Sequence, residues 1–332
     1  MNAKRIAVIG SGSWGTAVAN VLADAGNDVT IWGRDEVAID AIQKSHENVK
    51  YLKGQKLNPA LKASTDLAKT VASAEWVICS IPTQQIRKVF APIAKDLGDK
   101  PVVNTSKGIE IGTHMTVSEI FQEISPRSPY VILSGPSFAE EVVKRLPTLV
   151  TLASKDEKVL HAIQESLSTP YFRAYRSSDV VGVELAGALK NVVAIASGMV
   201  TGLALGYNSQ AAIINRGIAE ITRMGVKRGA EPMTFMGLAG TGDLILTCTG
   251  PLSRNRRVGV ALGEGKKLPQ IQRELGGVAE GVFTAQSAYE LAQRTGVEMP
   301  ITEQVYKILY HDGTPQGAVT ALMSRGLKEE WS

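Results

Sequence analysis

The chain has 332 residues, of which 44% are hydrophobic and 20% charged, and its formal net charge is +4. This composition is typical of a folded soluble protein and argues against a disordered chain, and the length favours two domains. The basic residues are spread along the chain, so the charge gives no indication of nucleic-acid binding. The two cysteines, Cys79 and Cys248, lie far apart, which argues against a disulfide framework or a zinc site and is typical of a reducing compartment.

The first residues, MNAKRIAVIG, combine a basic start with a short apolar run, as a signal peptide does. The run ends after about five residues at a glycine-rich segment, whereas the apolar region of a secretion signal has roughly 7–15 residues. We therefore expect a cytoplasmic protein.

Short β-branched runs alternate with helical patterns from residue 4 to about residue 175. The runs lie at 5–10, 28–32, 76–81, 101–106, 130–135, 148–153 and 171–175. They are continuously apolar rather than alternating, so we expect strands that are covered on both faces, in a doubly wound parallel sheet of the Rossmann type. We place a dinucleotide-binding domain at residues 1–180.

The strand signals stop at about residue 180, and the second half is rich in Ala, Gly and Leu and helical in pattern. We therefore expect an α/β chain whose C-terminal domain, residues 181–332, is all-α and binds the substrate. Its first helix contains VELAGALKNVVAIASG at 183–198, which is apolar almost all round except at Glu184, Lys190 and Asn191. A central lysine costs a membrane-spanning helix about 2.5–3.5 kcal/mol. We interpret this helix as buried between the domains, with no stable membrane insertion.

A glycine-rich turn follows the first predicted strand. Gly10, Gly12 and Gly15 form the pattern G-x-G-x-x-G between that strand and a predicted helix. In a dinucleotide site the first glycine permits a tight turn, the second lets a pyrophosphate approach the backbone, and the third lets helix and strand pack closely. The helix N-terminus offers free N–H groups and the positive end of its dipole to the phosphates. We therefore predict a site for NAD(H) or NADP(H).

The end of the second predicted strand bears on the choice between these cofactors. An acid there binds the ribose hydroxyls of NAD, whereas this chain has Gly33 and Arg34, with Asp35 one residue on. Because an arginine suits a 2′-phosphate, NADP(H) is favoured, and NAD(H) is also accepted. The alternative is a solvated Arg34 without a role in binding.

Hydride transfer to a carbonyl needs a group that gives or takes a proton, and a lysine is the better candidate here. The four histidines lie in polar or amphipathic segments, at His46, His114, His161 and His311. Lys190 lies in an apolar helix, and such surroundings lower the pKa of a lysine toward the working pH. The alternative is an ammonium group that reaches the surface at an edge of the helix.

Two segments of the first half could converge on Lys190. Lys107, in NTSKGIE, lies just beyond a predicted strand, at the edge where open α/β sheets bind ligands. In LSGPSFAEE, Gly135 begins a turn after the next strand. Ser137 and Glu140 also match a capping box, which would explain Ser137 without any role in binding.

A third segment, GLAGTGDLILTCTGPLSRNRR at 237–257, combines an acid with a basic loop. Asp243 lies in a glycine-rich turn, where we expect it to be exposed and able to pair with a buried lysine. Ser253, Arg254 and Asn255 offer a hydroxyl, a guanidinium and an amide, a set that suits a phosphate. A solvated basic loop is the alternative.

Six motifs together resemble the bacterial NAD(P)-dependent sn-glycerol-3-phosphate dehydrogenases. They are GSGSWGTA at 10–17, NTSKGIE at 104–110, GPSFAEE at 135–141, ELAGALKNV at 184–192, GTGDLILTC at 240–248 and SRNRR at 253–257. The resemblance covers essentially the whole chain. It implies reversible reduction of dihydroxyacetone phosphate to sn-glycerol 3-phosphate for phospholipid synthesis, with NADP(H) or NAD(H), without a metal, in a homodimer.

The resemblance also implies roles for individual residues, with Lys190 as proton donor and acceptor and with Lys107 and Asp243 as catalytic residues beside it. The implied substrate residues are Lys107, Gly135, Ser137, Lys190, Asn191, Asp243, Thr247, Ser253, Arg254 and Asn255. The implied cofactor residues are Gly10, Ser11, Gly12, Ser13, Trp14, Gly15, Arg34, Lys107, Ala139, Arg254, Val278 and Glu280.

Two other functions stay open from the residues alone. A related β-hydroxyacid dehydrogenase would share the two-domain plan and the catalytic lysine, but it would bind a carboxylate in place of a phosphate. A non-catalytic protein that senses NADP would bind the cofactor and signal through the helical domain.

Overall fold

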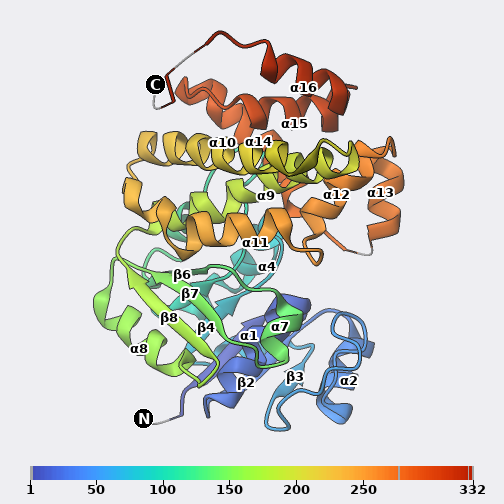
Figure 1. Ribbon diagram of the computed structural model, residues 1–332. Helices are drawn as coiled ribbons and strands as arrows, with labels where there is room; N and C mark the ends of the chain where they lie inside the picture. Colours follow the sequence, from blue (N-terminus) through green and yellow to red (C-terminus); the bar gives the residue numbers. More distant parts are fainter. Residues whose placement is uncertain (1–2, 276, 328, 331–332) are drawn as a thin grey trace.

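The computed structural model describes residues 3–275, 277–327 and 329–330, and its sheet half precedes its helical half (Figure 1). One sheet holds eight strands in the order β3-β2-β1-β4-β5-β6-β7-β8. The strands are β1 Arg5–Ile9, β2 Asp28–Trp32, β3 Lys62–Ser64, β4 Trp76–Cys79, β5 Val102–Asn104, β6 Tyr130–Ser134, β7 Thr148–Ala153 and β8 Phe172–Ser177. The predicted doubly wound α/β fold is confirmed.

Helices cover both faces of this sheet, as the continuous apolar strands predict. Along β1, Ile6 and Val8 face one hydrophobic core, and Ala7 and Ile9 face another. The helices of this half are α1 Ser13–Asp24, α2 Glu36–Ser45, α3 Leu67–Ala72, α4 Ile86–Phe90, α5 Ala94–Leu97, α6 Val117–Ile124, α7 Ala139–Val143 and α8 Glu157–Leu167, with the 3₁₀ turns η1 Thr83–Gln85 and η2 Ala91–Ile93.

One end of the sheet departs from the predicted parallel arrangement. Strand β7 runs antiparallel to β6, and β8 runs parallel to β7. The connection between β6 and β7 contains only α7, whose five residues span about 7.5 Å, whereas a five-residue strand spans roughly 17 Å. Because this short helix does not carry the chain back along the sheet, β7 enters from the opposite end. The prediction of a fully parallel sheet was therefore wrong at β7 and β8.

Every regular element that the structure describes after Ser177 is helical, as predicted. The helices are α9 Val180–Gly202, α10 Gly206–Lys227, α11 Asp243–Thr249, α12 Arg254–Gly263, α13 Leu268–Leu275, α14 Glu280–Thr295, α15 Pro300–Tyr310 and α16 Pro315–Met323, with the 3₁₀ turn η3 Pro232–Met236 and the π turn η4 Leu238–Gly242. Helices α10, α11, α12 and α14 pack around α9, which also contacts β6. Helix α9 therefore joins the two halves.

Helix α9 is the one described helix that is long and apolar enough to cross a membrane, and 94% of its most apolar window is buried inside the protein. Its first turn is capped by Asp179, whose carboxylate accepts hydrogen bonds from the backbone N–H of Gly182 and from Thr234. Burial of this extent is typical of the core helix of a soluble protein.

Helices α9 and α12 meet along a seam of glycines. A Cβ added to Gly198 would lie 2.1 Å from the carbonyl oxygen of Arg256, and one added to Gly259 would lie 2.0 Å from that of Ile195. Gly202 and Gly263 repeat this contact one turn further on. The two backbones touch because these positions have no side chain, and the seam fixes where α12 begins relative to α9.

Candidate active site

The glycine-rich turn between β1 and α1 has the geometry that its sequence predicts. Gly10 has a φ of +123°, and a Cβ there would lie 2.3 Å from the carbonyl oxygen of Ser80. A Cβ on Gly15 would lie 2.0 Å from the Gly10 carbonyl oxygen. A Cβ on Gly12 would meet no atom of the described chain within 4 Å. Gly12 therefore leaves open space at the N-terminus of α1.

A residue that sequence reasoning missed, Asn48, stabilises this turn through hydrogen bonds. Asn48 is fully buried, and its side-chain amide donates to the Ser11 carbonyl oxygen at 2.9 Å and to Thr16 Oγ1 at 2.8 Å. Its own carbonyl accepts from the backbone N–H of Tyr51, whose carbonyl oxygen accepts from Ser13 Oγ. Asn48 lies in a polar segment without periodicity, so no sequence signal distinguishes it from a solvated loop residue.

Two buried polar groups near this end of the sheet lack normal partners. Within the described residues, Trp14 Nε1 and both carboxylate oxygens of Glu280 form no hydrogen bond of normal geometry. Burial raises the pKa of Glu280 to about 7, against the opposing effects of the Thr83 backbone N–H and Arg254. Unpartnered buried groups are rare in native proteins, and a bound polar ligand would supply the missing partners.

Four other predicted cofactor residues come from four different segments of the chain. Arg34 follows β2 and is exposed, and Ala139 begins α7 and is half-buried. Val278 is 43% exposed. Arg254 is exposed at the first residue of α12, where a Cβ on Gly277 would lie 2.9 Å from Arg254 Nη1.

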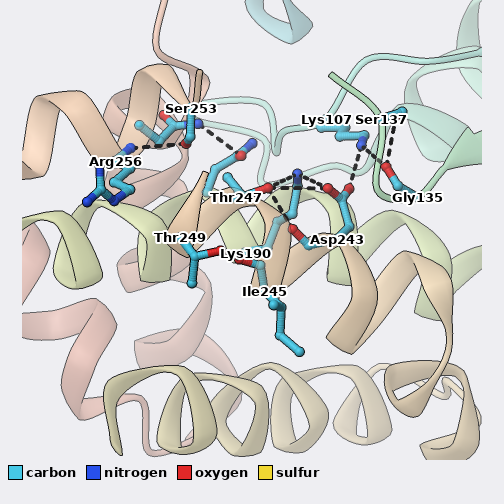
Figure 2. A network of polar contacts seen from close by, with 12 residues as sticks. Lys107, Gly135, Ser137, Lys190, Asp243, Ile245, Thr247, Thr249, Ser253 and Arg256 are labelled. Atoms are coloured by element: carbon cyan, nitrogen blue, oxygen red, sulfur yellow. Dashed lines mark hydrogen bonds and ion pairs between the residues drawn. The ribbon is translucent and has the colours of Figure 1, made fainter. Parts of the chain in front are cut away.

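A compact ion-pair network surrounds Lys190 (Figure 2). The Lys190 ammonium donates to Asp243 Oδ1 at 2.5 Å and to Thr247 Oγ1 at 2.6 Å. The Lys107 ammonium donates to the other oxygen, Asp243 Oδ2, at 2.6 Å. One carboxylate from α11 thus bridges a lysine on α9 and a lysine from the loop after β5. No histidine of the described chain hydrogen-bonds to these residues.

The charges in this network shift one another's pKa values. The pKa of Lys190 is lowered to about 8, chiefly by burial; the Lys107 ammonium also lowers it, and the Asp243 carboxylate opposes both. Burial alone would raise the pKa of Asp243, but the two ammonium groups hold it below its ordinary value. Asp243 is therefore an anion at neutral pH, and the Lys190 ammonium is a far stronger acid than an exposed lysine.

Asp243 is 2% exposed, so the prediction that it lies in an exposed turn was wrong. The glycines before it let the chain fold tightly onto η3, since a Cβ on Gly240 would lie 2.1 Å from the carbonyl oxygen of Phe235. The π turn η4 then leads directly into α11, whose first residue is Asp243. The tight turn directs this acid into the protein rather than toward solvent.

Ser137 does not cap a helix, so the predicted capping box with Glu140 was wrong. Helix α7 begins at Ala139, one residue too late for that spacing, and its N-cap residue, Phe138, forms no side-chain cap. Ser137 Oγ instead donates to the Gly135 carbonyl oxygen at 2.9 Å, and Lys107 Nζ donates to the same oxygen at 3.4 Å. Ser137 thus lies beside the network of charges.

Ser253, Asn255 and Asn191 lie together at the start of α12. Ser253 Oγ accepts from the Arg256 backbone N–H at 3.2 Å and so caps the helix. The Asn255 amide donates to Asn191 Oδ1 at 2.9 Å, and Asn255 Oδ1 accepts from the Gly281 backbone N–H at 2.9 Å. These contacts anchor the N-terminus of α12 to the residue that follows Lys190.

The described residues contain no group of three or more His, Cys, Asp or Glu side chains that could hold a metal ion. The network is thus built from two cations, one anion and hydroxyl and amide groups. Next to Lys107, a Cβ on Gly108 would lie 3.0 Å from Glu280 Oε2, so the network lies close to one of the unpartnered polar groups. Such a site can donate a proton to a substrate oxygen and bind an anion next to a dinucleotide.

Comparison with known proteins agrees with this chemistry. Residues 5–160 match the family model described as NAD-dependent glycerol-3-phosphate dehydrogenase N-terminus, and residues 179–329 match the one for the C-terminus of the same enzymes. A glycerol-3-phosphate dehydrogenase [NAD(P)+] of Citrifermentans bemidjiense is 50% identical over 332 residues, covering 99% of each chain. One of Myxococcus xanthus is 50% identical over 330 residues, covering 98% of each chain.

A solved structure gives the same result. The crystal structure of glycerol-3-phosphate dehydrogenase from Coxiella burnetii is 38% identical, covers 97% of this chain and 99% of that chain, and superposes with a TM-score of 0.94. The chain therefore belongs to the family of NAD(P)-dependent glycerol-3-phosphate dehydrogenases.

Proposed function

We propose that this chain reversibly reduces dihydroxyacetone phosphate to sn-glycerol 3-phosphate with NADPH or NADH and so supplies glycerophospholipid synthesis. The observation that carries the proposal is the buried Lys190–Asp243 pair, with Lys107 on the other oxygen of the same carboxylate. A lysine this deeply buried is rare without a partner. The arrangement suits a group that must exchange a proton with a substrate oxygen.

The residues of this chain fit the dinucleotide. Its phosphates would lie against Gly10–Gly15 and the N-terminus of α1, where Gly12 leaves open space. Trp14 Nε1 and the Glu280 carboxyl group, which have no hydrogen-bond partner of normal geometry within the described residues, would form hydrogen bonds with the dinucleotide. Ser11, Ser13, Lys107, Ala139, Arg254 and Val278 would line the same site, with Arg34 at the adenosine ribose. When bound, the cofactor supplies or accepts the hydride at C2 of the substrate.

Lys190 would act as the proton donor in reduction. Its ammonium hydrogen-bonds to the C2 carbonyl oxygen, stabilises the negative charge that grows there, and delivers a proton to the alkoxide. In the oxidation of sn-glycerol 3-phosphate, the neutral amine accepts the same proton. Asp243 and Thr247 hold the amine in place by the contacts described above.

The phosphate of the substrate would lie near the N-terminus of α12. Arg254 offers a guanidinium that suits a phosphate, and the helix N-terminus adds the positive end of its dipole. Ser253 and Asn255 orient that terminus through the contacts described above, and Asn191 links it to α9. Lys107 supplies further positive charge, and Gly135 and Ser137 lie beside it.

We also propose the domain division, the compartment and the oligomeric state. The end of β8 at Ser177 and the start of α9 at Val180 support a dinucleotide-binding domain at 1–180 and a substrate-binding domain at 181–332. We place the enzyme in the cytoplasm because its two cysteines are unpaired. We propose a homodimer from the family resemblance, and sedimentation equilibrium should then give twice the 35.4 kDa of one chain.

The decisive experiment follows the oxidation of NADPH in the presence of dihydroxyacetone phosphate. We expect turnover with this substrate and little or none with unphosphorylated dihydroxyacetone, because the latter lacks the group that α12 binds. Oxidation of 3-hydroxy acids in preference would instead indicate a β-hydroxyacid dehydrogenase. A folded sample that binds NADPH but turns over no substrate would contradict the proposal and favour a sensor.

A further inference from the structure

An ion pair lies at the adenosine end of the proposed cofactor site. Lys50, from the segment between α2 and β3, donates its ammonium to Asp35 Oδ2 at 2.5 Å. The other oxygen, Asp35 Oδ1, accepts from the backbone N–H of Ala38 at 3.1 Å and caps α2. The contact with Lys50 holds the pKa of Asp35 below its ordinary value. Both oxygens of this carboxylate are thus already engaged.

A side chain at Gly33, two residues before Asp35, would force Ser11 to shift. Gly33 directly follows β2, where enzymes that use NAD carry the carboxylate that binds the ribose hydroxyls. A Cβ on Gly33 would lie 2.1 Å from Ser11 Oγ and 2.8 Å from Ser11 Cβ. Ser11 is held in turn by Asn48, which donates to its carbonyl oxygen. Asp35 is therefore the acid that could serve the ribose from this end of the strand.

Arg34, between these two residues, is free to bind an anion. It is exposed, and within the described residues its guanidinium has no hydrogen-bond or ion-pair partner. An unpaired Asp35 beside it would attract the guanidinium and repel a phosphate. Lys50 removes both effects by pairing with Asp35.

We infer that Lys50 is a specificity-determining residue that favours NADP over NAD by occupying Asp35. With Asp35 paired, the ribose hydroxyls of NAD lose their acceptor, and Arg34 stays available to a 2′-phosphate. This inference rests on the proposed function, because it concerns the adenosine end of the same cofactor. The pair is solvent-exposed, with side chains 52% and 32% accessible, so its effect is modest and depends on salt.

The test is equilibrium binding of two nucleotides that lack nicotinamide, adenosine 2′,5′-bisphosphate and 5′-AMP, by isothermal titration calorimetry at low salt. Lys50→Ala should weaken binding of the bisphosphate by about three- to tenfold and leave binding of 5′-AMP unchanged or tighter. In an Asp35→Asn background the same substitution should cost much less. Asparagine caps a helix as well as aspartate does, so α2 keeps its N-terminus.

Lys53→Ala, an exposed lysine three residues along the same segment, is the matched control and should leave both affinities unchanged. Equal losses for the two nucleotides in Lys50→Ala, or no loss, would overturn the inference. An undiminished loss in the Asp35→Asn background would overturn it too, because Lys50 would then act without Asp35. Turnover of dihydroxyacetone phosphate by the same samples separates the two proposals, since it tests the reaction alone.

Discussion

At the scale of single residues, the acidity of Lys190 depends on a balance between burial and neighbouring charge. Burial favours the neutral amine, and the Lys107 ammonium acts in the same direction. The Asp243 carboxylate opposes both. The resulting pKa of about 8 lies close to neutral pH, where a general acid is most effective.

The pH dependence of the reaction should follow this pKa with opposite signs in the two directions. Reduction needs the ammonium, so kcat/KM for dihydroxyacetone phosphate should fall as the pH rises through about 8. Oxidation needs the neutral amine, so kcat/KM for sn-glycerol 3-phosphate should rise through the same pH. Initial rates in both directions between pH 6 and about 10 measure this. Profiles that bend in the same direction would exclude Lys190 as the titrating group.

Lys190→Met should lower kcat by about 10²-fold or more, because the alkoxide loses its proton donor. The variant should fold, since Asp243 keeps Lys107 as a partner and is not left as an unpaired buried charge. Stopped-flow kinetics and a fluorescence titration with NADPH separate the loss of rate from cofactor binding. Lys53→Met is the exposed control. Turnover close to that of the parent enzyme would remove Lys190 from the mechanism.

At the scale of elements, the glycine seam determines how closely α9 and α12 approach. Gly198→Ala would place a methyl group 2.1 Å from a backbone oxygen, and a backbone does not move aside as a flexible side chain does. Alanine gains about 1 kcal/mol of helix propensity over glycine, but the overpacking outweighs it. Overpacking typically costs about 1–3 kcal/mol, so we expect a net loss of up to about 2 kcal/mol in the free energy of unfolding.

Urea unfolding measures this loss, and Gly326→Ala is the control, because a Cβ there meets no atom of the described residues within 4 Å. An unchanged midpoint for Gly198→Ala would mean that the helices can separate without cost. The proposed substrate site gives a second readout, since Arg254 lies at the start of α12 and should move with it. KM for dihydroxyacetone phosphate should therefore rise in the same variant.

Helices and strands could be predicted where a strong local pattern of apolar residues determines the secondary structure. The continuous apolar runs identified seven strands, and α9 was recognised from its nearly uniform apolar surface. Strand β3, Lys62–Ser64, was missed because KAS contains no apolar run and forms a strand only by pairing with β2. The direction of β7, the burial of Asp243 and the anchoring role of Asn48 depend on contacts between distant segments. A local pattern carries no information on such contacts.

At the scale of the whole molecule, the two halves are joined by polar contacts as well as by packing. Glu184 of α9 accepts hydrogen bonds from the Ser118 backbone and hydroxyl at the start of α6 and from the Tyr130 hydroxyl of β6. Glu184 is 6% exposed, and the Lys107–Asp243 ion pair joins the halves again. Opening the halves would break these hydrogen bonds and the ion pair and would expose the apolar surface of α9 where it packs on β6, so it costs free energy.

We therefore expect the chain to unfold in a single transition. Trp14, Trp32 and Trp76, three of the four tryptophans of the chain, lie in the sheet half, so fluorescence reports mainly that half. Circular dichroism at 222 nm reports the helices, and most helical residues lie in the second half. The two urea curves should have the same midpoint, as in a two-state protein. Separate midpoints would show that the halves are stable independently of each other. NADPH should shift both curves together, because it binds only the folded chain.

The glycine seam has a further consequence for substrate choice. Lys190 lies on α9 and the proposed phosphate site begins α12, and no layer of side chains separates the two backbones at the seam. Because the two backbones are in contact, we expect α9 and α12 to move together, so the spacing between the proton donor and the anion site should stay constant. The seam thus fixes the distance between Lys190 and the phosphate site. A keto phosphate whose carbonyl lies one carbon nearer to or farther from the phosphate would reach one of these two sites and miss the other.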